Sequence, residues 1–347
     1  MIVIDRRGFV GGLAAFGLAA GITPAGAGRR QPPAPLSVDN FSVVLDDLEH
    51  AEGIAATPDG RLFLSNGDGA LAVRETNGRL RQIGKPIAPT GVAIDLQGRA
   101  IVANMGLLKN VGGPLQRIDV ASGTAETLVT ELEGRQLVAS NGPAVARDGT
   151  IYCTHTGWAP AANIGTTTPA GFICRVKPDG GADIVARGLR GANGLCLDRE
   201  ERFLYCSLTA EARIRRWRRL PDGTLADPED YGPQLGAARS DQMARDIFAM
   251  PAAERAALGY CDGIGFDMAG NLWITLPFAN RLVALTPDRR LVDIVHDPDG
   301  RMIAMPTNLC WAGRDRRDLH VVSRGSGRIV KARTAIAGAP LANWPRA

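Results

Sequence analysis

The chain has 347 residues, 45% of them hydrophobic, which predicts a soluble protein with a sizeable buried core in one large domain or two ordinary ones. The 40 basic and 36 acidic side chains give a formal net charge of +4, which is too small to indicate a nucleic acid or an anionic surface as partner. The composition therefore favours a small-molecule partner, and the basic run RIRRWRR from Arg213 is typical of a solvated outer strand rather than of a nucleic-acid interface.

The first 27 residues have the features of an export signal. Two arginines at positions 6 and 7 precede Phe9, an apolar run rich in small residues follows, and the tripeptide AGA at 25–27 provides an A-x-A cleavage site. The pattern predicts a twin-arginine signal peptide over 1–27, a linker over 28–39, and a mature protein that is periplasmic or secreted, without stable membrane insertion. A retained membrane anchor is the alternative, but the run is short and glycine-rich against the roughly 20 residues of a membrane span.

The remainder of the chain repeats one short frame. It consists of an apolar run, a polar turn with glycine, and a second run rich in β-forming residues, as in EGIAATPDGRLFLSN from Glu52. Such a frame predicts a β-hairpin. Four copies have Gly at both the second and the ninth place, the fifth has one extra residue at the turn, and the sixth, TNLCWAGRDRRDLHVVS, is looser. The six copies begin at Glu52, Thr90, Asn141, Asn193, Asp262 and Thr307.

The spacing of the frames predicts the fold. Strand-like runs such as ALAVRE, LQRIDV and RLVALT follow each frame, so that a unit of about four strands recurs about every 40 to 50 residues. This period predicts an all-β protein with a six-bladed β-propeller over residues 40–347. We expect NFSVVLDDL, from Asn40, to close the ring as the outer strand of the last blade. The helix-like stretch at about 240–259 predicts a short helical insertion over one face.

In a propeller, the first residues of the six frames form a circle near one mouth of the ring, and all six carry a side-chain oxygen. Two carboxylates and two amides would be costly to bury together unless a cation lay between them. We therefore predict a divalent metal site with the ligands Glu52, Asn141, Asn193 and Asp262. Such oxygen ligands suit Ca²⁺ best, with Zn²⁺, Mn²⁺ and Mg²⁺ as alternatives. The other interpretation is that Asn-Gly and Asp-Gly simply form turns.

Four segments carry a resemblance to a known family. HAEGIAATPDGRLFLS, SNGPAVARDGTIY, GANGLCLDREERFLY and CDGIGFDMAGNLWIT resemble the ligand-bearing strands of the senescence-marker-protein/gluconolactonase family of six-bladed lactonases, and more distantly paraoxonases, over about residues 40 to 335. The resemblance implies that Glu52, Asn193 and Asp262 are metal ligands and that Asn141 approaches the metal or the substrate. The segment CTHTGW in the third repeat departs from the family, which often has Thr-Asp or Gly-Thr there, and this leaves the substrate open.

These residues predict a metal-dependent hydrolase that opens a lactone ring with a metal-activated water. Asp262 is the first catalytic candidate, and His155, at the end of a strand in the third repeat, is the second. Asn141, Thr90, His155 and Trp158 are the substrate-binding candidates. A structural, hydrogen-bonded role for His155 is the alternative. Alternatives for the protein are another metal-dependent propeller enzyme, such as an isomerase, lyase or esterase, or a non-catalytic binding propeller.

The six cysteines lie in apolar, strand-like runs without C-x-x-C or histidine-rich spacing. This pattern argues against a zinc cluster and predicts buried free thiols. A disulfide between Cys196 and Cys206, which flank one predicted hairpin, is the alternative.

Overall fold

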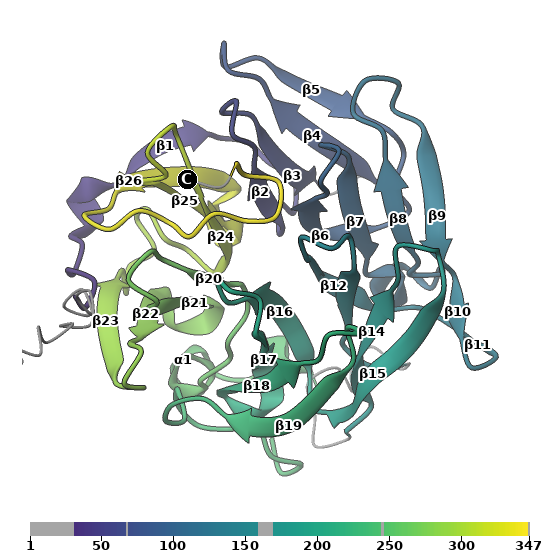
Figure 1. The fold of residues 1–347 in the computed structure, drawn as a ribbon. Helices are drawn as coiled ribbons and strands as arrows, with labels where there is room; N and C mark the ends of the chain where they lie inside the picture. Colours follow the sequence, from purple (N-terminus) through teal and green to yellow (C-terminus); the bar gives the residue numbers. More distant parts are fainter. Residues whose placement is uncertain (1–30, 67–68, 159–168, 244–245, 346–347) are drawn as a thin grey trace, which may run out of the picture. The chain divides into compact units, whose positions relative to one another are not determined.

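The computed structural model describes residues 31–66, 69–158, 169–243 and 246–345. Six antiparallel sheets of four strands each are arranged in a ring about a common axis (Figure 1), which confirms the six-bladed β-propeller. The predicted signal peptide and residues 28–30 lie outside the described residues, so export stays a prediction. No helix in the described ranges is long and apolar enough to cross a membrane.

Each sheet forms one blade, and in blades 1 to 5 the strands follow one another in chain order from the inner to the outer edge. Blades 1 to 3 consist of β2 (Ile54–Ala56), β3 (Leu62–Asn66), β4 (Ala70–Arg74) and β5 (Leu80–Ile83); β6 (Pro89–Ile94), β7 (Ala100–Asn104), β8 (Leu115–Ile118) and β9 (Ala125–Val129); and β12 (Ser140–Val145), β13 (Ile151–His155), β14 (Gly171–Val176) and β15 (Ala182–Leu189). Blades 4 and 5 consist of β16 (Ala192–Leu197), β17 (Phe203–Leu208), β18 (Arg213–Arg219) and β19 (Leu225–Asp230); and β20 (Ile264–Phe266), β21 (Leu272–Leu276), β22 (Arg281–Leu285) and β23 (Leu291–His296).

Blade 6 closes the ring by joining the two ends of the propeller. It consists of β24 (Pro306–Ala312), β25 (Asp318–Ser323), β26 (Arg328–Arg333) and, as its outer strand, β1 (Ser42–Leu45). The first strand of the chain therefore pairs antiparallel with the last, with Val43 opposite Val330. This confirms the predicted closing strand, and it replaces an open seam with backbone hydrogen bonds.

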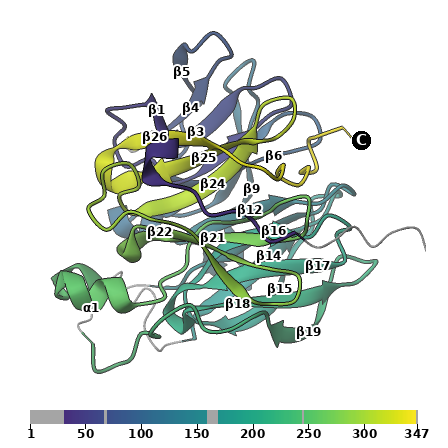
Figure 2. The ribbon, with the colours of Figure 1, turned by 90° about the vertical axis from the view of Figure 1, so that its left-hand side faces the viewer.

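The predicted helical insertion is present, but it is short. Within 240–259 the described residues form the 3-10 turn η5 (Ile247–Ala249) and the α-helix α1 (Ala252–Ala257). A helix of this length is not stable alone, and a small cluster of Ile247, Met250 and Leu258 packs beside it. In Figure 2, α1 and the C-terminal segment lie on opposite sides of the propeller. The other short elements are the hairpin β10 (Glu131–Leu132) and β11 (Arg135–Gln136) and the 3-10 turns η1 (Val38–Asn40), η2 (Gly106–Lys109), η4 (Thr209–Glu211), η6 (Pro277–Ala279) and η7 (Arg324–Ser326).

The two glycines of the repeated frame are required for different reasons. The second-place glycines lie against the backbone of the next blade, where a Cβ atom would clash: it would come within 2.2 Å of Thr90 O for Gly53, 2.0 Å of Asn141 O for Gly91, 2.4 Å of Asn193 O for Gly142, 2.3 Å of Asp262 O for Gly194 and 2.7 Å of Thr307 O for Gly263. The ninth-place glycines turn the hairpins with a positive φ, as at Gly98 (77°). In the fifth frame Glu201 takes this turn position with a φ of 55°.

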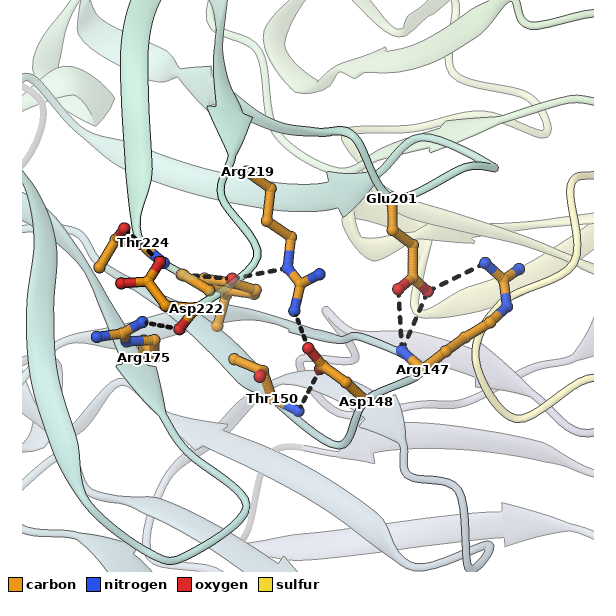
Figure 3. Close-up of polar contacts among 10 residues, drawn as sticks. Arg147, Asp148, Thr150, Arg175, Glu201, Arg219, Asp222 and Thr224 are labelled. Carbon is orange, nitrogen blue, oxygen red and sulfur yellow. Dashed lines mark hydrogen bonds and ion pairs between the residues drawn. The ribbon is translucent and has the colours of Figure 1, made fainter.

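The basic run on β18 is paired with acidic side chains. Arg215 Nε lies 2.9 Å from Asp230 Oδ1 on the adjacent strand. Arg219 extends to blade 3, where its Nε donates to the Tyr152 hydroxyl at 2.9 Å. Its Nη2 forms an ion pair with the carboxylate of Asp148 (Figure 3). These pairs explain the run as blade-to-blade and strand-to-strand contacts on the outer part of the propeller.

A second link between blades 3 and 4 uses the unusual turn residue of the fifth frame. The carboxylate of Glu201 accepts from the backbone N–H of Arg147 at 3.1 Å and from the Arg147 guanidinium at 3.1 Å (Figure 3). Because a non-glycine residue in the left-handed region costs about 1–2 kcal/mol, this charged hydrogen bond offsets part of the strain at that turn.

All six cysteines are buried free thiols. Across β16 and β17, Cys196 lies opposite Tyr205 and Cys206 lies opposite Leu195. Neighbouring residues of a strand point to opposite faces of the sheet, so Cys196 and Cys206 pack into different core clusters. The alternative of a Cys196–Cys206 disulfide is therefore wrong.

The contact at the second-place glycines predicts a large cost for a single methyl group. We expect Gly194→Ala to lower the free energy of unfolding by about 3 kcal/mol or more, because the added Cβ would lie 2.3 Å from Asp262 O. The clash involves two backbone segments, so the inner strands of blades 4 and 5 would have to move apart. Gly98→Ala is the matched control: it has a positive φ but open space around the Cβ position, so about 1–2 kcal/mol is expected. Urea denaturation followed by circular dichroism measures both, and equal costs would contradict the explanation.

Candidate functional site

The first residues of all six frames line one cavity of about 630 Å³. Glu52 and Asp262 each lie two residues before the start of an inner strand, whereas Thr90, Asn141, Asn193 and Thr307 lie within inner strands. Ile247 and Phe248 of the insertion also line the cavity, so it opens on the face that carries η5 and α1. The predicted circle of oxygen-bearing side chains is thus formed at one mouth of the ring.

Hydroxyl groups on the second strands hold neighbouring inner strands together beside this cavity. Thr154 Oγ1 in β13 accepts from the Gly142 N–H at 2.7 Å and donates to Asn193 O of the next blade at 2.6 Å. The same link recurs from Ser207 Oγ to Asp262 O at 2.6 Å and from Thr275 Oγ1 to Thr307 O at 3.1 Å. These links fix the backbone from which the oxygen-bearing side chains extend.

Two further threonines fix the orientation of the amides. Thr156 Oγ1 donates to Ala192 O at 2.9 Å, so toward Asn141 Nδ2, 3.0 Å away, it can only accept. The amino group of Asn141 is therefore turned to Thr156, which leaves its Oδ1 as the acceptor in the cavity. Thr209 has a similar place beside Asn193: its Oγ1 lies 3.3 Å from Nδ2 and donates its proton to a backbone carbonyl of the next blade, while the Asn193 side chain also hydrogen-bonds to Asp262.

Two of the carboxylates that line the cavity, those of Glu52 and Asp262, lie close to one another and to Arg324. Asp262 is 7% exposed, and burial raises the pKa of its carboxyl well above the usual range; the nearby Glu52 raises this pKa further, while Arg324 and a hydrogen bond from Asn193 oppose the shift. Arg324 forms an ion pair with Glu52 through a direct hydrogen bond. The protein thus brings these two carboxylates together, with the Arg324 guanidinium in direct contact with Glu52.

The structure places His155 and Trp158 outside the lining of this cavity, which corrects the expectation that they reach the mouth. The His155 ring is 1% exposed, and its Nε2 accepts from the backbone N–H groups of Val138 and Ala139 at 3.2 and 3.1 Å. It stacks on Phe172 at 4.5 Å and lies 4.3 Å from the Trp158 ring. These contacts match the structural alternative for His155. Its neighbours Thr154 and Thr156 face the inner strands because side chains alternate along β13.

Several functional candidates were missed by sequence reasoning. Thr156, Tyr260 and Arg324 line the cavity, yet none belongs to the first place of a frame. The sequence did contain a signal for the hydroxyl groups on the second strands. Ser65, Thr154 and Thr275 each stand thirteen residues after the start of their frame. Arg324 follows the last frame in a turn, and no repeat marks it.

The donor set suits a hard cation. Among the described residues no three His, Cys, Asp or Glu side chains gather as a metal-binding group, so a cation here would depend on the amide oxygens as well as on the two carboxylates. Both amides are oriented for that role by Thr156 and Thr209. Carboxylate and amide oxygens together are the ligands that Ca²⁺ accepts.

Residues 51–325 match the family of the SMP-30/gluconolactonase/LRE-like region. A gluconolactonase from Zymomonas mobilis is 22% identical over 252 residues, which are 72% of this chain and 64% of that protein. The chain thus spans less than two thirds of the length of this relative.

Solved structures share the fold. A gluconolactonase from Xanthomonas campestris matches with a TM-score of 0.66 and 20% identity, over 88% of this chain and 95% of that one. Regucalcin from Agrobacterium tumefaciens, described as a calcium-binding protein, matches with a TM-score of 0.64 and 16% identity, over 86% of this chain and 94% of that one.

The buried histidines predict a loss of stability in mild acid. Burial, with a contribution from Arg135, lowers the pKa of His155 to about 3, and burial lowers that of His320 to about 4. Both lie below the unfolded value of about 6.5, so the unfolded chain binds protons first. The stability that the neutral rings provide is present above pH 6.5 and is lost as the pH falls toward 3, by about 1.4 kcal/mol per pH unit for each ring.

His155→Gln, which keeps an acceptor for the two backbone N–H groups, should remove about half of the slope contributed by the two rings between pH 6 and pH 5. Denaturant unfolding at several pH values measures the slope. His296→Gln, at an exposed position of β23, is the control and should leave it unchanged. A slope that His155→Gln does not alter would mean that this ring is protonated without unfolding.

Proposed function

Because the chain belongs to the SMP-30/gluconolactonase/LRE-like family, we propose that it is a lactonase that depends on a divalent cation. The observation that carries the proposal is the convergence of four oxygen-bearing side chains from four blades on one cavity: Glu52, Asn141, Asn193 and Asp262. The name of the Zymomonas relative, a gluconolactonase, supports lactone hydrolysis.

These four residues would hold the cation, and Ca²⁺ is the ion we propose. The charges of Glu52 and Asp262 balance a divalent ion, and the two amide oxygens add ligands without adding charge. The calcium-binding description of the regucalcin structure supports this choice over Zn²⁺, Mn²⁺ or Mg²⁺. Thr156 and Thr209 contribute by keeping the amide oxygens turned to the site.

The proposed reaction adds water across the acyl C–O bond of the ring. A bound divalent cation supplies Lewis-acid polarisation of the carbonyl and lowers the pKa of water. Asp262 accepts a proton from the attacking water, whose oxygen bonds to the carbonyl carbon. The bond between that carbon and the ring oxygen breaks, and the ring oxygen takes up a proton, so that the product is a hydroxy acid. Asn141 and Thr90, which line the cavity, would contact the ring.

The proposal predicts the loss of a metal-dependent activity in a variant of nearly unchanged shape. Asp262→Asn should lower the rate of hydrolysis by about 10²–10⁴-fold, because it removes the proton acceptor and one ligand charge. In the unaltered protein, EDTA should abolish hydrolysis and added Ca²⁺ should restore it. Release of acid from a lactone in weak buffer, followed with a pH indicator, measures each rate.

Asp293→Asn, at an exposed ion pair of β23, is the matched control and should hydrolyse normally. Thermal unfolding shows that each variant is folded. Hydrolysis that survives both Asp262→Asn and EDTA would place the reaction at another site.

The ion pair between Glu52 and Arg324 predicts that removing the arginine strengthens cation binding but lowers the stability of the cation-free protein. Arg324→Met should bind Ca²⁺ about tenfold more tightly or better, because the guanidinium repels a cation and competes for the Glu52 carboxylate. In EDTA, the same variant should unfold at a lower temperature than the unaltered protein, since the buried Asp262 and the partly buried Glu52 lose their counter-charge.

Isothermal titration calorimetry with Ca²⁺ and thermal unfolding in EDTA measure the two effects without any substrate. Arg290→Met, in an exposed turn of blade 5, is the control for removing an arginine. A Ca²⁺ affinity that does not change in Arg324→Met would show that Arg324 does not compete with the cation.

A further inference from the structure

Three aromatic side chains, those of Phe248, Tyr260 and Phe278, form one side of the proposed catalytic cavity. Tyr260 stands two residues before Asp262, and its ring centroid lies 4.8 Å from that of Phe278. The Phe278 ring in turn lies 5.8 Å from the Phe248 ring in an edge-to-face contact. All three residues line the cavity, so a row of contacting aromatic rings extends from beside Asp262 to the rim.

The facing wall is aliphatic. Met105 and Leu108 line the cavity from blade 2, through η2 and the residue before it. Phe278 belongs to blade 5, through η6. In a ring of six blades, blades 2 and 5 lie opposite each other (Figure 1). The space above the carboxylates is therefore bounded by apolar side chains on two opposed sides.

The rim exposes large apolar side chains, and one guanidinium, that of Arg255, lies 5.7 Å from the centroid of the Phe248 ring. Phe248 is 62% exposed and Leu108 is 61% exposed, which makes them the most exposed large apolar side chains among the described residues. Both belong to this one cavity. Exposed apolar surface that is concentrated at the mouth of a pocket marks a site for an apolar ligand group.

The size of the cavity agrees with a ligand larger than a bare ring. At about 630 Å³ it lies in the range of roughly 300–1,000 Å³ that encloses molecules of drug size. An unsubstituted lactone over Glu52 and Asp262 would leave the aromatic and aliphatic walls in contact with water.

We infer that the substrate is a lactone whose ring carries an apolar alkyl or aryl substituent. This inference rests on the proposed lactonase function and names its substrate class. The ring lies over the carboxylates and amides, and the substituent lies between Phe248 and Phe278 on one side and Leu108 and Met105 on the other. Each methylene group that these walls remove from water favours binding by a factor of about 4.

The test compares three δ-lactones as substrates of the full-length protein with Ca²⁺ present. δ-Valerolactone has no substituent, δ-decalactone carries a five-carbon chain, and glucono-δ-lactone carries hydroxyl groups. We expect kcat/KM for δ-decalactone to exceed both others by at least about tenfold, since burial of two methylene groups already provides a factor of this size. A higher kcat/KM for glucono-δ-lactone than for δ-decalactone would overturn the inference while leaving the lactonase function intact.

Substitutions at the rim locate the effect. Phe248→Ser and Leu108→Ser should each lower the ratio of kcat/KM for δ-decalactone to kcat/KM for δ-valerolactone by about fivefold or more. Leu291→Ser, at an exposed position of the outer strand β23, is the matched control and should leave the ratio unchanged. A ratio that no rim variant lowers would overturn the placement of the substituent.

A binding measurement separates this inference from the proposed function. If the protein hydrolyses none of the lactones, calorimetric titration with δ-decalactone and δ-valerolactone still measures binding. Tighter binding of δ-decalactone, weakened in Phe248→Ser, would reject the hydrolase and retain the apolar site. Equal affinities, or no binding of either compound, would overturn the apolar site as well.

Discussion

The structure depends on the close approach of each inner strand to the next. A Cβ atom on Gly91 would lie 2.0 Å from Asn141 O, so the two backbones meet with no space for a side chain. The same contact recurs at Gly194, against Asp262 O. Because the frame places an oxygen-bearing residue directly before each of these glycines, the contact that narrows the ring also draws those residues around one axis. The pair formed by an oxygen-bearing residue and a glycine, repeated at the start of the frames, therefore shapes both the ring and the site.

The close approach of the inner strands also brings charged side chains together in the cavity. Glu52 and Asp262 are far apart in the sequence, but the ring brings them close enough for Glu52 to raise the pKa of Asp262. Arg324 pairs with Glu52, and Thr156 and Thr209 each hold the amino group of an asparagine. Every polar group near the carboxylates thus has a partner or faces the cavity. A divalent cation would satisfy both carboxylates together.

The sequence predicted what is periodic and missed what depends on side-chain direction. Six frames with a fixed phase were enough for the blades, the closing strand and the circle of oxygens. His155 was expected at the mouth from its distance along the strand, but adjacent residues of a strand face opposite ways. Since Thr154 and Thr156 bond to the next inner strand, His155 between them turns to the loop at Val138. Arg324 begins the turn after β25 as Thr209 begins the turn after β17, but the residue types differ, so the repeat could not reveal a charge there.

The cavity has two parts of different origin. Its floor comes from the first places of the frames, where the ring geometry fixes the backbone. Its walls come from segments that follow the frames: the turns η2 and η6, and the insertion that carries Phe248. Because the hairpins do not depend on these segments, their side chains can change without moving the floor. The repeated geometry of the blades therefore positions the polar floor, whereas in the inference above Leu108, Phe248 and Phe278 select the molecule that binds there.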